Sequence, residues 1–78
     1  MTYSSTRTDS DEIRGQIKQA LFELEPHYRT VIVLKHLQGL SYREVAELIG
    51  VPEKTVKSRL FTARSRLRNI LVERGMAV

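Results

Sequence analysis

The segment from Leu40 to Pro52 places the tightest limit on how this chain can fold. Ser41, followed three residues later by Glu44, is a capping box, in which each side chain bonds the other residue's backbone N–H at the start of a helix. Gly50 predicts the end of that helix, because glycine tolerates the left-handed backbone of a sharp turn. Pro52 suits the start of another helix. The segment therefore predicts a short helix, a glycine turn and a second helix, which is a helix-turn-helix.

Apolar residues at helical spacing predict how the short helix packs. Leu40, before the cap, and Val45, at the fourth helical position, form a hydrophobic staple. Ala46 is small, as a close crossing of two helices requires. The side chains expected to face inward are Val45, Ala46, Leu48 and Ile49.

The helix after Pro52 has two different faces. Its apolar stripe consists of Val56, Leu60, Ala63, Leu67, Ile70 and Leu71. Its opposite face has cations, small hydroxyls, one aromatic and no acid: Lys54, Lys57, Ser58, Phe61, Thr62 and Ser65. Such a face suits a polyanion whose bases are recognised; the alternative is a solvated cationic face. The helix-turn-helix pattern that precedes this face favours the first interpretation. Residues 52–78 carry seven basic and two acidic side chains of a chain with net charge +4, which indicates binding to nucleic acid or to an acidic surface.

Two further helices are predicted upstream. Asp9 or Ser10 can cap the first, which should end near Leu24, and Gly15 in its interior costs about 1 kcal/mol relative to alanine. The second should run from Pro26 to Gly39.

No segment alternates like a strand, so we expect an all-α, winged-helix-like domain of four helices without a sheet. We place a disordered lead or linker remnant at 1–8, the domain at 9–75 with its helix-turn-helix at about 41–66, and a frayed tail at 76–78.

Position on a helix-turn-helix assigns roles, because the second helix enters the major groove with its N-terminal residues at base edges. The expected base contacts are Lys57, Ser58, Phe61 and Thr62. The expected phosphate contacts are Tyr42, Arg43, Lys54, Thr55, Arg59, Arg64, Ser65 and Arg66. Phe61 suits a thymine methyl group, or else packs on another protein or on the first helix. Arg59 has an ion pair with Glu44 or Glu47 as its alternative, and Arg64 and Arg68 have ion pairing or solvation.

The sequence gives little indication of metal binding, catalysis or membrane insertion. The chain has no cysteine, and its histidines, His27 and His36, lack partners at metal-ligand spacing, so we expect no metal site. There is no nucleophile elbow and no glycine-rich phosphate loop, so we expect neither an enzyme nor a cofactor. No apolar run is long enough to span a membrane, and the absence of cysteine suits a cytoplasmic protein.

The stretch LEPHYRTVIVLKHLQGLSYREVAELIGVPEKTVKSRLFTARSRLR resembles region 4 of bacterial sigma factors of the extracytoplasmic-function (ECF) class. The resemblance covers about residues 11–72 and implies a domain of sigma region 4 type. It also implies binding to the promoter −35 element, docking on the flap of the RNA polymerase β subunit, and sequestration by an anti-sigma factor. The base-contacting positions carry over to Lys57, Ser58, Phe61 and Thr62. Thr62 departs from relatives with arginine there, so their −35 sequence does not carry over.

The resemblance leaves three expectations open. Region 2, the other DNA-binding domain of a sigma factor, is absent, so we expect this chain to be part of a longer protein. No dimer helix is evident, so we expect a monomeric domain. An apolar groove for the polymerase would lie beside the first two helices, with Ile13, Ile17, Leu21, Val33 and Leu37 as candidate lining residues, although each such residue is more often plain core.

Two alternatives remain. One is the effector domain of a LuxR-type response regulator, which has a similar four-helix fold but usually a histidine-containing recognition segment. The other is a protein-interaction module whose basic helix binds an acidic partner such as an anti-sigma factor.

Overall fold

The computed structural model describes the backbone of residues 2–76 and the side chains of residues 11–76. Its elements, in order, are α1 (Thr2–Glu23), α2 (Pro26–Ile32), the π-helical segment η1 (Val33–Leu37), α3 (Tyr42–Ile49) and α4 (Glu53–Glu73). The described part contains no strand. The all-α helix-turn-helix prediction is therefore confirmed.

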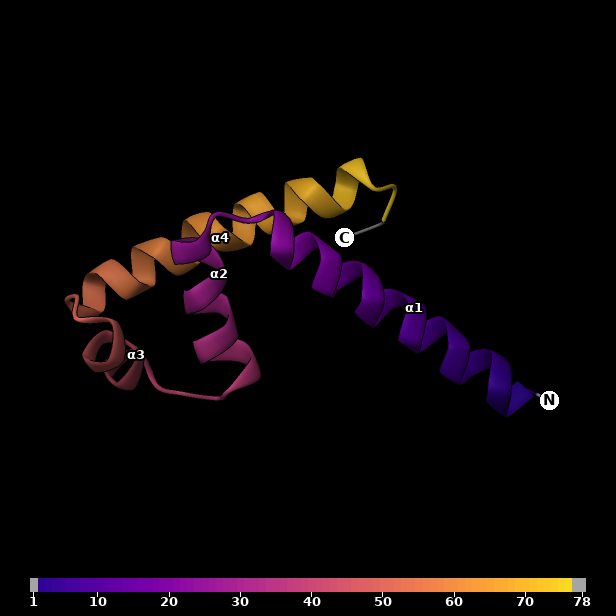
Figure 1. Cartoon of the computed structure of the whole chain (residues 1–78), viewed down its shortest axis with the longest axis horizontal. Coiled ribbons are helices and arrows are strands. Elements are labelled where there is room, and N and C mark those ends of the chain that lie inside the picture. Colours follow the sequence, from indigo (N-terminus) through magenta and orange to yellow (C-terminus); the bar gives the residue numbers. More distant parts are fainter. Residues whose placement is uncertain (1, 77–78) are drawn as a thin grey trace.

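Helix α4 organises the packing. It runs along the top of the view in Figure 1, with α2 and α3 beneath its first half, while α1 leads away toward the N-terminus. Val31 of α2, Val45 of α3 and Val56, Leu60 and Ala63 of α4 are almost fully buried where these helices meet. The predicted apolar stripe of α4 is thus the centre of the core.

Helix α1 begins earlier than predicted. It starts at Thr2 rather than after a cap at Asp9 or Ser10, because residues 2–14 contain neither proline nor glycine to stop a helix. Its end at Glu23 agrees with the prediction. The proposed boundaries near residues 8 and 75 remain predictions, and residues 77 and 78 of the expected tail lie outside the described residues.

The second predicted helix is two segments. After α2, the backbone N–H of Gln38 donates to the carbonyl of Val33 at 2.9 Å, a π-helical bond. Gly39 then adopts φ +73°, and the N–H of Leu40 donates to the carbonyl of Leu34 at 3.1 Å. Gly39 therefore ends this helical stretch as predicted, but nothing in the sequence indicated the π turn.

The capping box of α3 is present. The Ser41 N–H donates to Glu44 Oε1 at 2.8 Å, and the Glu44 N–H donates to Ser41 Oγ at 3.0 Å. Gly50 ends the helix with φ +74°, a left-handed conformation that side chains rarely adopt, so the turn into α4 needs glycine.

The prediction that Leu48 faces inward is wrong. Its side chain is 65 % exposed, whereas Val45 and Ala46 are buried and Ile49 is half-buried. Helix α3 packs through a narrow stripe, and Leu48 lies beyond its border.

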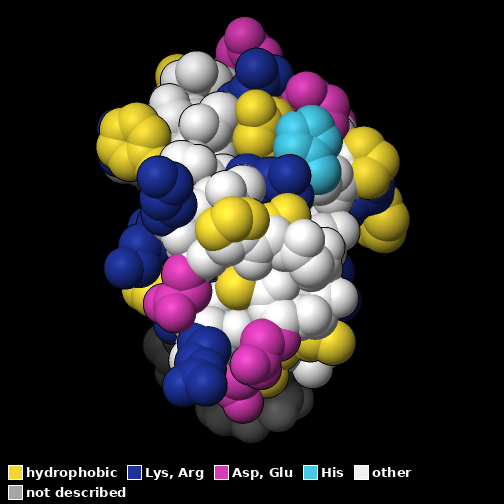
Figure 2. All heavy atoms as spheres, turned by 90° about the vertical axis from the view of Figure 1, so that its left-hand side faces the viewer, with side chains coloured by type: hydrophobic (Ala, Val, Ile, Leu, Met, Phe, Trp, Pro, Cys, Tyr) yellow, Lys and Arg dark blue, Asp and Glu magenta, His cyan; other side chains and the backbone are white. Residues whose placement is uncertain are grey.

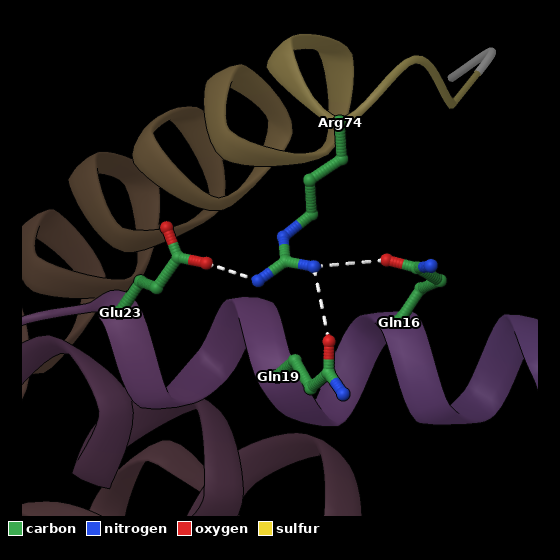
Figure 3. A network of polar contacts seen from close by, with 4 residues as sticks. All are labelled: Gln16, Gln19, Glu23 and Arg74. Atoms are coloured by element: carbon green, nitrogen blue, oxygen red, sulfur yellow. Dashed lines mark hydrogen bonds and ion pairs between the residues drawn. The ribbon is translucent and has the colours of Figure 1, made fainter.

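A polar network joins the C-terminal end of α4 to the second half of α1 (Figure 3). Arg74, just after α4, donates to Gln16 Oε1 at 3.0 Å and to Gln19 Oε1 at 3.1 Å, and it pairs with Glu23. All three acceptors lie on α1. The network therefore fixes the C-terminal end of α4 against the second half of α1.

Candidate nucleic-acid interface

The first turns of α4 expose most of the predicted base-contacting side chains. Lys57, Ser58 and Phe61 are exposed, with Phe61 at 76 %, and Thr62 is half-buried. Ser58 Oγ donates to the carbonyl of Thr55 at 3.1 Å, so this hydroxyl already has a partner in the helix. The exposure of Phe61 excludes its packing against the first helix, one of the two alternatives for it.

Tyr42 lies between two lysines on one flank of α4. The ammonium of Lys35, from η1, is 4.8 Å from the centroid of the Tyr42 ring, and that of Lys57, from α4, is 5.3 Å from it. A cation over an aromatic face is attracted by the ring's quadrupole. Tyr42 therefore gathers two positive charges at the start of α3, one of them from Lys35, which sequence reasoning missed.

Arg64 is held on the same flank by His36. Arg64 Nε is 3.2 Å and Nη2 is 2.9 Å from His36 Nε2. Burial lowers the pKa of His36 most, and the positive charges of Arg64 and Lys35 lower it further. No described carboxylate pairs with Arg64, so the ion pair considered as an alternative for it is not formed, and its partner is instead a ring nitrogen.

The opposite flank of α4 faces the start of α2. Arg66 pairs with Glu25 at 2.9 Å, and its guanidinium lies 5.0 Å from the centroid of the Tyr28 ring. Arg59 lines a shallow hollow with Pro26, His27, Thr30 and Ile49. The structure therefore does not bring these two predicted phosphate contacts together with Lys57 and Arg64.

The remaining predicted contacts occupy the start of α3 and the outer face of α4. Arg43 pairs loosely with Glu47 at 3.7 Å, and no described carboxylate pairs with Arg59, so the Arg59 ion pair considered above is not formed. Lys54 and Ser65 are exposed and Thr55 is half-buried. Figure 2 views the end of the molecule that carries α3 and the start of α4, and shows Lys and Arg side chains gathered mainly along its left side.

An apolar groove lies away from this surface, between α1 and the α2–η1 stretch. Its volume is about 330 Å³, and it is lined by four apolar side chains and two cations: Leu21, Phe22, Val33, Leu37, Lys18 and Arg29. Three predicted groove residues, Leu21, Val33 and Leu37, therefore lie together. We name these six residues the α1–η1 groove.

The other two residues predicted for the groove are elsewhere. Ile17 packs against the core, and Ile13 is 50 % exposed on α1, outside the groove. Phe22 was missed, although it is 74 % exposed with the Arg29 guanidinium 5.4 Å from its ring. The sequence did carry a signal for Phe22: it directly follows Leu21 and so lies off the apolar stripe of the first helix, where a large aromatic side chain is expected to be exposed.

The described residues also bear on metal binding and on membrane insertion. Among the described residues, no three His, Asp or Glu side chains are grouped so as to hold a metal ion. No described helix combines the length and apolar character needed to cross a membrane.

The family model and the curated relatives that match this chain all belong to sigma factors. The family model for sigma-70, region 4, matches residues 14–67. The chain is 42 % identical over 60 residues to the ECF RNA polymerase sigma factor SigW of Bacillus subtilis (strain 168), covering 77 % of this chain and 32 % of that protein. It is 38 % identical over 60 residues to the ECF RNA polymerase sigma-E factor of Escherichia coli (strain K12), covering 77 % and 31 %.

A third relative extends the match. The ECF RNA polymerase sigma factor SigE of Mycolicibacterium smegmatis is 35 % identical over 71 residues, or 91 % of this chain and 26 % of that protein. The chain thus spans about a third or less of the length of these curated relatives.

Proposed function

Because this chain belongs to the sigma-70 region 4 family, in its ECF class, we propose that it recognises the promoter −35 element through α4 and docks on RNA polymerase through a separate groove. The observation that carries the proposal is the outer face of α4. There an exposed aromatic side chain, Phe61, lies beside Arg64 and Arg68 on the helix that follows a capped helix and a left-handed glycine turn. This arrangement suits entry of α4 into the major groove.

Base contacts would come from the exposed start of α4. Lys57 and Ser58 offer hydrogen-bond donors and acceptors to base edges, and Phe61 offers apolar contact to a thymine methyl group. Thr62 is too short for the two-pronged contact to guanine that arginine makes. We therefore expect the preferred −35 sequence to differ at that position from that of relatives with arginine.

Phosphate contacts would orient the domain on the duplex. The phosphate contacts that we propose from the exposed or half-buried positions are Tyr42, Arg43, Lys54, Thr55, Arg59, Arg64 and Ser65. Lys35, beside Tyr42, joins them. Arg66 keeps its proposed role, but Glu25 competes with phosphate for its guanidinium.

Selection of DNA from a random pool tests the function. The chain would be placed in its polymerase context, and bound duplexes would be sequenced. A recovered −35-like sequence that binds better than a scrambled duplex supports the proposal. Recovery of no common sequence contradicts it.

We propose that the α1–η1 groove receives the β flap. Its four apolar side chains, together with the cations Lys18 and Arg29, suit an amphipathic helix with acidic edges. Phe22→Ala and Leu37→Ala should weaken polymerase binding without changing DNA preference. Leu48→Ala, which removes another exposed apolar side chain that lies outside the groove, should leave polymerase binding unchanged. Equal polymerase binding by all three variants and the unmodified chain would refute this assignment.

Two further proposals follow from the family. An anti-sigma factor would sequester the domain by covering the same surfaces, and the site of action would be the cytoplasm, where RNA polymerase works. Isolation of the domain with a negatively charged partner that competes with DNA would support the first of these.

A further inference from the structure

His36 lies outside the helix-turn-helix yet contacts its second helix. The segment η1 carries the imidazole to Arg64, whose Nε and Nη2 lie 3.2 and 2.9 Å from His36 Nε2. A guanidinium has only donors, so the ring nitrogen must accept. This assigns the neutral imidazole with its proton on Nδ1.

The contact uses one edge of the guanidinium and leaves the other free. Nη1 of Arg64 remains available to a phosphate while Nε and Nη2 are held. Arg64 also lines a small hollow with Phe61, Ser65 and Arg68 on the exposed side of α4. A held arginine therefore stands directly beside the side chain that we propose to contact a base.

We propose that His36 is a positioning residue for DNA recognition, which holds Arg64 so that it meets a phosphate only when α4 is seated in the correct register. This inference rests on the proposed DNA-binding function. A fixed cation favours one placement on the duplex, whereas a mobile arginine follows phosphates in any placement. Loss of the contact should therefore reduce discrimination between sequences more than it reduces total binding.

The chemistry makes this role depend on pH. An imidazolium has no lone pair at Nε2, so protonation of His36 breaks the contact with Arg64. Burial lowers the pKa of His36 below its ordinary value of 6.5, and the two cations that act on the ring, Arg64 from α4 and Lys35 from η1, lower it further. The contact is complete above that value and is lost as the pH falls through the lowered pKa.

Binding of the 78-residue chain to a matched and a scrambled duplex tests the role. The ratio of the dissociation constant for the scrambled duplex to that for the matched duplex should fall about 2- to 10-fold in the unmodified chain as the pH is lowered from about 8 through the lowered pKa of His36, the cost of one freed side chain. His36→Gln, whose amide oxygen accepts without titrating, should keep this ratio constant and high. His36→Ala should keep it low throughout the pH series, and His27→Gln should behave as the unmodified chain.

A measurement without DNA separates this role from the proposed function. The Nε–H signal of Arg64 in nuclear magnetic resonance should exchange more slowly with solvent in the unmodified chain and in His36→Gln than in His36→Ala. Equal exchange in all three would overturn the contact itself. Discrimination that His36→Ala leaves unchanged would overturn only the role of His36, whereas no discrimination by the unmodified chain at about pH 8 would overturn the proposed function and this role with it.

Discussion

At the scale of single residues, the two phenylalanines of this chain are its most informative side chains. Phe61 and Phe22 are 76 % and 74 % exposed, while the core is built from aliphatic residues. An exposed aromatic ring forgoes a large area of apolar burial, and a partner that covers it regains that area. One ring lies on the proposed DNA face and the other in the α1–η1 groove, so the two mark two separate surfaces.

Replacing Phe61 should separate sequence recognition from general binding. We expect Phe61→Ala to weaken binding to a matched −35 duplex by about 1–3 kcal/mol, because a base contact is lost, with little change on a scrambled duplex. Lys54→Ala is the matched control, because a phosphate contact carries no sequence information and its loss should weaken both complexes alike. Fluorescence anisotropy titrations on both duplexes measure this. Equal losses for Phe61→Ala on both duplexes would show that the ring does not contact a base.

At the scale of the elements, local sequence determined α3 and the turn into α4. The Ser41–Glu44 capping box marks the start of a helix, and Gly50 accepts the left-handed backbone that ends it, so these boundaries could be predicted without tertiary information. The exposure of Leu48 could not be predicted from local sequence, because it depends on how narrow the contact between α3 and α4 is. The π turn of η1 could not be predicted either, and with it the approach of Lys35 and His36 to the DNA face was missed.

The capping box should make stability depend on pH. The backbone N–H of Ser41, and to a lesser extent its side chain, lowers the pKa of Glu44 below its ordinary value of 4.5. A lowered pKa in the folded state contributes stability above the unfolded value, which is lost as the pH falls through the folded value. Glu44→Gln keeps an acceptor but cannot titrate. We expect the difference in unfolding free energy between the two proteins to shrink as the pH falls below 4.5.

Denaturant titrations followed by circular dichroism at several pH values measure that difference. Glu47→Gln, on the exposed surface of the same helix, is the control, because Glu47 takes no part in the cap. A pH response for Glu44→Gln no larger than that for Glu47→Gln would argue against a contribution from the cap.

Helix α1 offers a site for stabilisation. Nothing lies within 4 Å of a Cβ built on Gly15, so an added methyl group meets no obstacle. Gly15→Ala should raise the free energy of unfolding by about 0.5–1 kcal/mol, because alanine loses less backbone entropy in a helix. Thermal unfolding measures the change. Gly50→Ala is the contrasting variant, since φ +74° there disfavours any side chain, and it should be destabilising. A loss of stability for Gly15→Ala would show that α1 needs the glycine.

At the scale of the whole molecule, ion pairs separate Arg66 and Arg74 from the other cations in the last third of the described chain. In the described part of the chain, Glu25 pairs with Arg66 and Glu23 with Arg74, both toward the side where α1 meets α4. The cations on the other side of α4 have no carboxylate partner among the described residues: Lys54, Lys57, Arg64 and Arg68. The positive charge of the last third of the chain is therefore left uncompensated mainly where we propose that DNA binds.

This division predicts a graded dependence of DNA binding on salt. Each phosphate contact should add about −0.9 to the slope of log K against log salt concentration. Lys54→Ala should therefore make the slope less steep by nearly the amount that one phosphate contact adds. Arg66→Ala should change the slope less, because Glu25 already balances the charge of Arg66 in the free protein. The isolated chain should bind short DNA weakly, since tethering to the polymerase normally raises the effective concentration. Titrations at several salt concentrations measure these slopes, and an equal reduction by both variants would place Arg66 on the DNA with Lys54.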